Sequence, residues 1–206
     1  MDNAKLEILD LAKQEVLDNP ESELEFWHAW RQVVGQLGDD DSRQLDTAIH
    51  EAGHAVMCWL VECPFEYVTI VPREEEESLG HVLHAPFPEH LVKDINSGPC
   101  KASELYMDRR MIISLAGYAA ECLYLEPQTP DSEQSKGDLD SAFDYTTYRF
   151  DGPEVQEEYI NDMLQAAKES LLAFYLHLAV LAIELLQEKI LQHDNASSLL
   201  SKVPIS

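Results

Sequence analysis

The chain has 206 residues, of which 45% are hydrophobic and 26% are charged, so it can bury one sizeable core. Its 14 Lys and Arg residues stand against 39 Asp and Glu residues, which gives a net charge of −25. Nucleic acid and anionic membrane surfaces would be repelled by this charge. They are excluded as partners, and basic or neutral polypeptides are favoured.

The N-terminal region predicts two helices, at residues 2–17 and 21–37. Apolar residues recur in both at helical spacing, and an Asn-Pro pair separates them. A glycine and three consecutive aspartates follow, which predicts a solvated junction. We therefore expect an N-terminal helical segment, residues 1–38, that packs in one compact unit with a domain of residues 39–206.

The most informative local pattern is the HExxH pentad His50-Glu51-Ala52-Gly53-His54. Asp46-Thr47 has the character of an N-cap, and apolar residues continue at helical spacing as far as Leu60, so a helix is predicted here. Histidines four residues apart lie on one helical face, where both imidazoles can bind one metal ion. Glu51 can take a proton from the attacking water and pass it to the leaving amine. The pentad predicts a zinc hydrolase; the alternative is two surface histidines on an acidic helix.

The next region predicts the strands. The runs 65–71 and 79–83 are rich in β-branched and aromatic residues and predict a β-hairpin, joined by an exposed acidic connection at 73–78. Prolines and the stretch 96–99 then predict a loop, and a long helix fits residues 103–125.

The C-terminal part predicts mostly helix. After a loop at 126–136, Gly137-Asp138 opens a further helix, and residues 153–193 are almost uninterruptedly helical in pattern. The most apolar stretch, 171–186, contains His177 and Glu184, and its uncharged run is shorter than the roughly 18 to 20 residues that cross a bilayer. No membrane segment is predicted.

The cysteines show no CxxC pairing, and no secretory leader pattern opens the chain; they are Cys58, Cys63, Cys100 and Cys122. We interpret them as reduced thiols in a cytoplasmic protein. Cys58 follows His54 by four residues, but its helical direction is rotated by about 80° from that of His50. Core packing is therefore predicted for Cys58.

A catalytic zinc ion usually has three protein ligands and one open position, and the pentad supplies only two ligands. The sequence lacks the third histidine that extends the pentad in metzincins. From the residues alone the candidates are Glu121 on the later helix, Asp138 or Asp140 at a helix start, and His81 or His84 in the hairpin.

Four blocks resemble the zinc protease domain of the FtsH-like membrane AAA proteases, in the same order and spacing. They are HEAGHAV at 50–56, VTIVPR at 68–73 with LGHVLHAP at 79–86, LAGYAAECLY at 115–124, and GDLDSA at 137–142. The resemblance runs from about residue 48 to the C-terminus. It implies a mainly α, zincin-type protease domain with a small hairpin or sheet after the HExxH helix, a Zn²⁺ cofactor and polypeptide substrates.

The resemblance also implies roles for individual residues. Asp138 would be the third metal ligand, with a plain helix cap as the alternative. Glu121 would accept the second ring N–H of a zinc-bound histidine. An extended substrate is expected to pair with an edge strand formed by Gly80, His81, Val82 and Leu83.

The chain also departs from the family pattern, in which an ATPase module and a membrane anchor precede the protease domain. Residues 1–47 are too short for an ATPase and contain no GxxxxGK phosphate loop. We therefore expect a cytoplasmic, ATP-independent endopeptidase for unfolded or short polypeptides, which acts as a homo-oligomer or with a delivery partner. The alternative is a non-catalytic, zinc-stabilised binding or adaptor protein. Against it stands Glu51, which a purely structural zinc site does not require.

Overall fold

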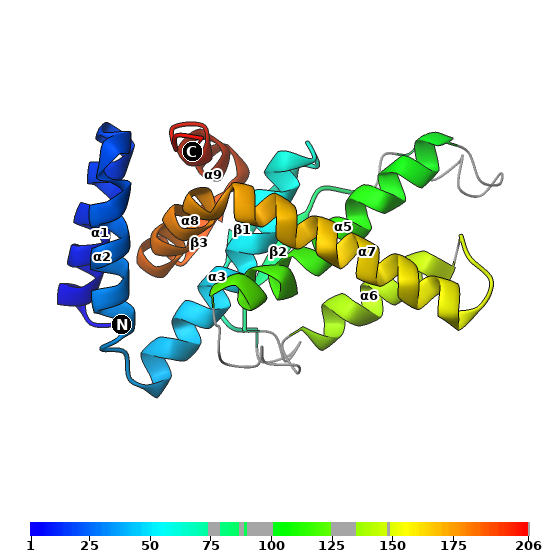
Figure 1. Ribbon diagram of the computed structural model, residues 1–206, viewed down its shortest axis with the longest axis horizontal. Coiled ribbons are helices and arrows are strands. Elements are labelled where there is room, and N and C mark those ends of the chain that lie inside the picture. Colours follow the sequence, from blue (N-terminus) through cyan, green and yellow to red (C-terminus); the bar gives the residue numbers. More distant parts are fainter. Residues whose placement is uncertain (74–78, 87–88, 90–100, 125–134, 148, 206) are drawn as a thin grey trace.

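The computed structural model describes residues 1–73, 79–86, 89, 101–124, 135–147 and 149–205 (Figure 1). The expected acidic connection after residue 73, the loop at 96–99 and most of the loop at 126–136 lie outside the described residues. Helices dominate, so the mainly α fold is confirmed. They are α1 (Asn3–Asp18), the 3-10 helix η1 (Pro20–Ser22), α2 (Glu23–Val34), α3 (Asp39–Leu60), α5 (Lys101–Tyr124), α6 (Lys136–Thr147), α7 (Pro153–Ala173), α8 (Tyr175–Glu188) and α9 (His193–Leu200).

The motif helix α3 runs through the centre of the molecule. In the view of Figure 1, α1 and α2 lie to its left and α6 lies to its right. Every residue from Thr47 to Cys58 is buried, because α5, α8 and the sheet pack around this part of the helix. Gly53 allows a close crossing of α3 and α5, since a Cβ there would lie 2.6 Å from the Ala116 carbonyl oxygen. Side chains of one helix can therefore reach residues of the other across this crossing.

The start of α3 differs from the prediction. The helix begins at Asp39, after Gly38 as N-cap, and not at Asp46-Thr47. Asp39, Asp40 and Asp41 occupy its first turn, where carboxylates are stabilised by the positive end of the helix dipole. The acidic run that suggested a solvated junction is therefore part of the helix.

A three-stranded antiparallel sheet follows α3, with the order β2-β1-β3. Its first two strands, β1 (Phe65–Thr69) and β2 (His81–His84), form the predicted hairpin, with Val68 opposite Val82. The third strand, β3 (Ile190–Gln192), lies in a stretch predicted to be helical. Among the described residues β2 has a neighbouring strand on one side only.

The origin of β3 is a helix stop at Lys189. This residue ends α8 in the left-handed conformation, with φ of 64°. Its carbonyl then accepts the Ile70 N–H at 3.0 Å and the Thr69 hydroxyl at 2.9 Å, so the chain joins the edge of β1. A lysine gives no sequence signal for this conformation, which is why the strand was missed.

The predicted long C-terminal helix is also divided. The helix is interrupted at Phe174, and α7 and α8 meet there at a bend of 82°. No glycine or proline marks the break, so helical spacing alone did not reveal it. Among the described residues no single helix is both long and apolar enough to cross a membrane; only the bent pair α7 and α8, taken together, meets that test.

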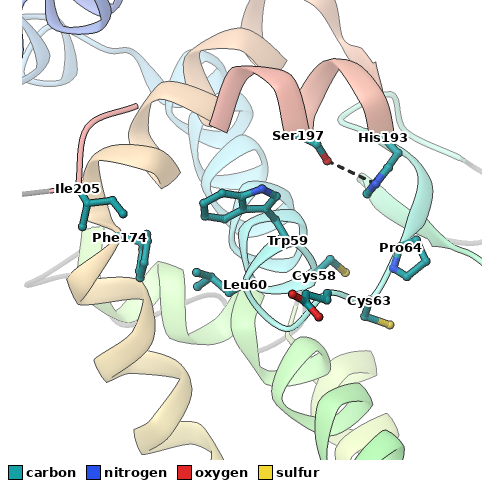
Figure 2. A pocket seen from close by; sticks show the side chains of 10 residues that line it. Cys58, Trp59, Leu60, Cys63, Pro64, Phe174, His193, Ser197 and Ile205 are labelled. Atoms are coloured by element: carbon teal, nitrogen blue, oxygen red, sulfur yellow. Dashed lines mark hydrogen bonds between the residues drawn. The ribbon is translucent and has the colours of Figure 1, made fainter. Parts of the chain in front are cut away.

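Residues at the C-terminal end of α3 line an open pocket of about 580 Å³ (Figure 2). Its lining residues are Cys58, Trp59, Leu60, Glu62, Cys63, Pro64, Phe174, His193, Ser197 and Ile205. Cys58 itself is 1% exposed, as predicted for a core residue, and burial raises the pKa of its thiol. None of the residues of the HExxH pentad lines this pocket.

Candidate metal centre

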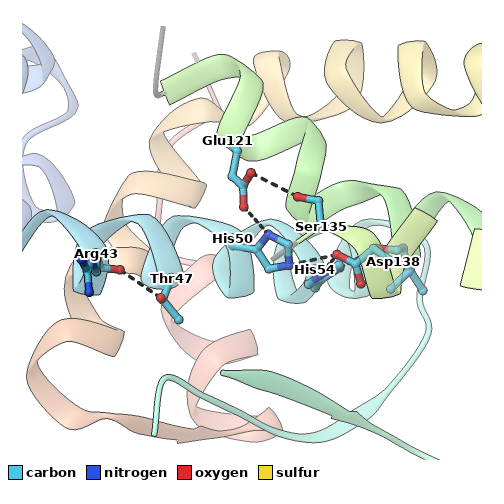
Figure 3. A network of polar contacts seen from close by, with 8 residues as sticks. Arg43, Thr47, His50, His54, Glu121, Ser135 and Asp138 are labelled. Carbon is cyan, nitrogen blue, oxygen red and sulfur yellow. Dashed lines mark hydrogen bonds and ion pairs between the residues drawn. The ribbon is translucent and has the colours of Figure 1, made fainter. Parts of the chain in front are cut away.

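Three side chains converge at the middle of α3 (Figure 3). His50 and His54 project from one face of the helix, and their Nε2 atoms are 3.0 Å apart. Asp138, in the first turn of α6, places Oδ2 2.9 Å from the His50 Nε2 and 3.1 Å from the His54 Nε2. These three atoms are the potential ligands of one ion. They come from two helices, and His54 and Asp138 are 84 residues apart in sequence.

The spacing of the three atoms suits zinc. Ligand atoms that lie 2.0 to 2.1 Å from a tetrahedral zinc ion are about 3.3 Å from one another. The observed separations are only slightly shorter, and a modest outward shift of the three side chains would admit the ion. Two imidazoles and one carboxylate are also a ligand set that leaves a fourth position open for water or substrate.

The second nitrogen of each imidazole is held by α5. The His54 Nδ1 lies 2.7 Å from the Ile113 carbonyl oxygen, and the His50 Nδ1 lies 2.7 Å from Oε1 of Glu121. A carbonyl oxygen can only accept, so the His54 Nδ1 carries a proton, and in the neutral ring its Nε2 presents a lone pair to the site. Glu121 is 1% exposed and its other oxygen accepts the Ser135 hydroxyl at 3.2 Å, so it can orient His50 in the same way.

The charges of the cluster favour a cation. Burial opposes a positive charge on His50, but hydrogen bonds to Asp138 and Glu121 outweigh this effect and raise its pKa to about 10. Burial likewise opposes ionisation of Asp138, yet the two histidines hold its pKa well below the usual range. In the absence of a metal, protons occupy the position between these groups, and a divalent ion would replace them.

Glu51 lies beside this cluster without belonging to it. Its side chain is 4% exposed, and its Oε2 has no hydrogen-bond partner among the described residues. Burial raises the pKa of Glu51 to about 7, although the neighbouring His50 and His54 favour the ionised form. A carboxylate that titrates near neutral pH and has a free oxygen can both accept and return a proton.

Two glycines shape the space around these groups. A Cβ on Gly117 of α5 would lie 2.5 Å from the His54 Nε2 and 2.6 Å from the His50 Nε2. A Cβ on Gly80 would lie 2.8 Å from the Cγ of Glu51. Both backbones therefore approach the site more closely than any other residue would permit. Gly117 lies in the block LAGYAAECLY, and nothing in the sequence alone indicates its contact with the two histidines.

The remaining candidates lie outside the three-ligand cluster. Asp140 is exposed, one residue beyond the inward-facing part of α6. His81 contacts the Tyr67 hydroxyl at 3.1 Å, and the His84 Nδ1 lies 3.7 Å from the Cys58 sulfur. Of the residues expected to pair with a substrate, Gly80 packs on Glu51, and His81, Val82 and Leu83 follow it in β2.

Comparison with known families agrees with this geometry. The model of peptidase family M41 matches residues 38–148, just over half of the chain. The matched span contains α3, the hairpin, α5 and α6, and with them every residue of the metal cluster and both carboxylates beside it. No curated protein matches the chain.

Proposed function

The chain belongs to peptidase family M41, the FtsH-like zinc metalloproteases, and on this premise we propose that it is a zinc-dependent, ATP-independent endopeptidase for unfolded or short polypeptides. Membership of a metallopeptidase family supports protease activity and polypeptide substrates in general. The observation that carries the specific proposal is the buried carboxylate oxygen of Glu51, which has no partner among the described residues and lies beside the convergence of His50, His54 and Asp138. A site that served only to hold the fold together would have no need of it.

Each residue then has a definite task. His50, His54 and Asp138 would hold the ion, while Glu121 and the Ile113 carbonyl keep the two imidazoles in the ligating orientation. When bound, zinc polarises the scissile carbonyl and lowers the pKa of its water to about 7. Glu51 takes one proton from the attacking water at its carboxylate and delivers it to the nitrogen of the leaving amine as the C–N bond breaks.

The substrate is proposed to bind as an added strand. Among the described residues β2 is the outer strand of the sheet and packs near α3, so an extended peptide can pair with His81–His84 while its scissile bond lies near Glu51. Only polypeptide that is already extended can bind in this way. These 206 residues contain no GxxxxGK loop, so we propose that their peptidase activity requires no nucleotide.

The N-terminal helices and the cysteines complete the proposal. Residues 1–38 are taken as a helical segment that packs on a peptidase domain of residues 39–206; Lys13 of α1 contacts Glu184 of α8 at 2.5 Å. The described cysteines, Cys58, Cys63 and Cys122, are free thiols, which agrees with the cytoplasm as the place of action.

The test is a fluorogenic peptide assay with zinc-loaded protein, with and without chelator and ATP. Cleavage should need zinc, should be unaffected by ATP, and should fall at least about a hundredfold in Glu51→Gln at unchanged zinc content. The control is Glu66→Gln, an exposed carboxylate on β1. Full activity in Glu51→Gln would refute the assigned role, and a zinc-loaded wild type that binds peptides without cleaving them would indicate a binding protein.

Whether folded substrates are refused needs a second assay. One substrate is digested side by side in its native form and in a permanently unfolded form, with and without ATP. The unfolded form alone should be cut. Cleavage of both forms at one rate, faster than the native form unfolds, would contradict the proposal.

A further inference from the structure

Arg110, on α5, is a half-buried cation that has no acidic partner among the described residues. Its Nε and Nη1 atoms are buried and have no hydrogen-bond partner in the same part of the chain. The guanidinium interacts with the Tyr145 hydroxyl and the Cys63 thiol, neither of which is a carboxylate. Within the part of the chain that the structure describes, no ion pair to Arg110 is formed. Buried, cationic N–H donors of this kind are suited to bind a carboxylate.

The position of Arg110 connects it to the metal centre. It lies three residues before Ile113 on α5, one helical turn from the carbonyl that holds His54. Its charge also acts on His84 at the end of β2: burial lowers the pKa of His84 to about 3, and Arg110 and His54 contribute to the same shift. Arg110 is therefore close to both the end of the edge strand and the metal ligands.

The edge strand gives the direction in which a bound peptide would reach this cation. β2 leads from Gly80, which packs on Glu51, to His84, whose Nδ1 lies 3.7 Å from the Cys58 sulfur. Cys58 is four residues beyond His54 on α3, a rise of about 6 Å, which about two residues of extended peptide would span. A peptide on β2 would thus bring a residue about two positions from the scissile bond next to Arg110.

We propose that Arg110 binds a carboxylate of the peptide substrate, about two residues from the scissile bond, and makes the protease selective for an anionic group at that position. The inference rests on the proposed function. A guanidinium can bind a carboxylate through two parallel N–H donors, and its Nε and Nη1 atoms are the ones without partners. The carboxylate would come either from an acidic side chain or from the C-terminus of a short peptide.

Peptide binding tests the inference without turnover. Zinc-loaded Glu51→Gln protein is titrated with fluorescent peptides that carry Glu or Gln at each position within three residues of the scissile bond, each as free acid and as C-terminal amide. A charge-assisted bond predicts about tenfold or more tighter binding of one Glu peptide over its Gln partner, or of the free acids over the amides. The first outcome identifies a side chain as the source, and the second a C-terminus.

The decisive variants are Arg110→Met, which should abolish this ratio, and Arg110→Glu, which should shift the preference to Lys at the same position. The matched control is Arg109→Met, the neighbouring residue on α5, which should keep the ratio. Zinc content and thermal unfolding are measured for each variant, because a purely structural role would change these and not the Glu-to-Gln ratio.

An unchanged ratio in Arg110→Met, the absence of any carboxylate preference, or no binding of the acidic peptides would each overturn the inference. Failure of the proposed function is distinguishable. Carboxylate-dependent binding through Arg110 in a wild-type protein that cleaves nothing would leave this inference standing and reject the peptidase. Cleavage without carboxylate preference would support the peptidase and reject the role of Arg110.

Discussion

The Nδ1 of His50 lies 2.7 Å from Oε1 of Glu121, a buried contact that joins α3 to α5 across 71 residues of sequence. It fixes the ring of His50 with its Nε2 toward Asp138 and His54. The carboxylate thus serves the candidate metal centre without being one of its ligands.

Loss of this contact should weaken metal binding. Glu121→Ala leaves the His50 Nδ1 without an acceptor and should lower zinc affinity about 10- to 100-fold, measured by competition with a chromogenic chelator. Glu121→Gln keeps an acceptor oxygen and should retain most of the affinity. Equal affinity in all three proteins would show that Glu121 does not orient His50.

The identity of the third ligand is tested on α6. Asp138→Ala should lower zinc occupancy to the level of His50→Ala and His54→Ala, because each change removes one of the three converging atoms. Asp140→Ala is the matched control on the same helix, with an exposed side chain, and should keep its zinc. Metal content is read by mass spectrometry after dialysis. Full zinc occupancy in Asp138→Ala would show that Asp138 is not a ligand and favour the alternative, a simple helix cap.

Filling the space between the two histidines should also lower zinc binding, although all three ligands remain. Gly117→Ala adds a methyl group 2.5 Å from the His54 Nε2 and should abolish zinc binding, with helical content retained in circular dichroism. Gly137→Ala, whose added methyl group meets nothing within 4 Å, serves as control. Normal zinc binding in Gly117→Ala would mean that α3 and α5 are farther apart than described.

Acid should destabilise the fold through His177. This residue is 2% exposed and stacks on Trp59 at 5.6 Å, and burial lowers its pKa to about 4 from an unfolded value of 6.5. Above pH 6.5 both states are neutral, so nothing is lost. Between pH 6.5 and 4 the unfolded chain takes up a proton that the folded chain refuses, so the contribution of His177 to the free energy of unfolding should fall by about 2 kcal/mol and level off below pH 4.

The measurement is urea unfolding at pH 7, 5.5 and 4. His177→Gln should show a shallower decrease between pH 7 and 4 than the wild type, relative to its own value at pH 7. Leu178→Ala, a buried neighbour on α8, should be less stable at every pH with the wild-type pH dependence. Parallel curves for wild type and His177→Gln would show that His177 is not the source.

The sequence by itself determined the features that depend on near neighbours in the chain. Two histidines four apart share a helical face wherever the helix lies, and two short runs rich in aromatic and β-branched residues predict the hairpin after it, so both followed from local sequence. The resemblance added Asp138 and Glu121, which local spacing could not separate from Asp140, His81 and His84.

Only the tertiary structure decided how distant segments meet. The break at Phe174 and the left-handed Lys189 that starts β3 depend on packing, for which the residues themselves give no local signal. The same holds for the close approach of Gly117, and for the Glu51 oxygen and the Arg110 nitrogens that have no hydrogen-bond partner among the described residues. Periodicity reports which face of one element is buried, whereas a site depends on what another element places against that face, and this is fixed only when the helices pack.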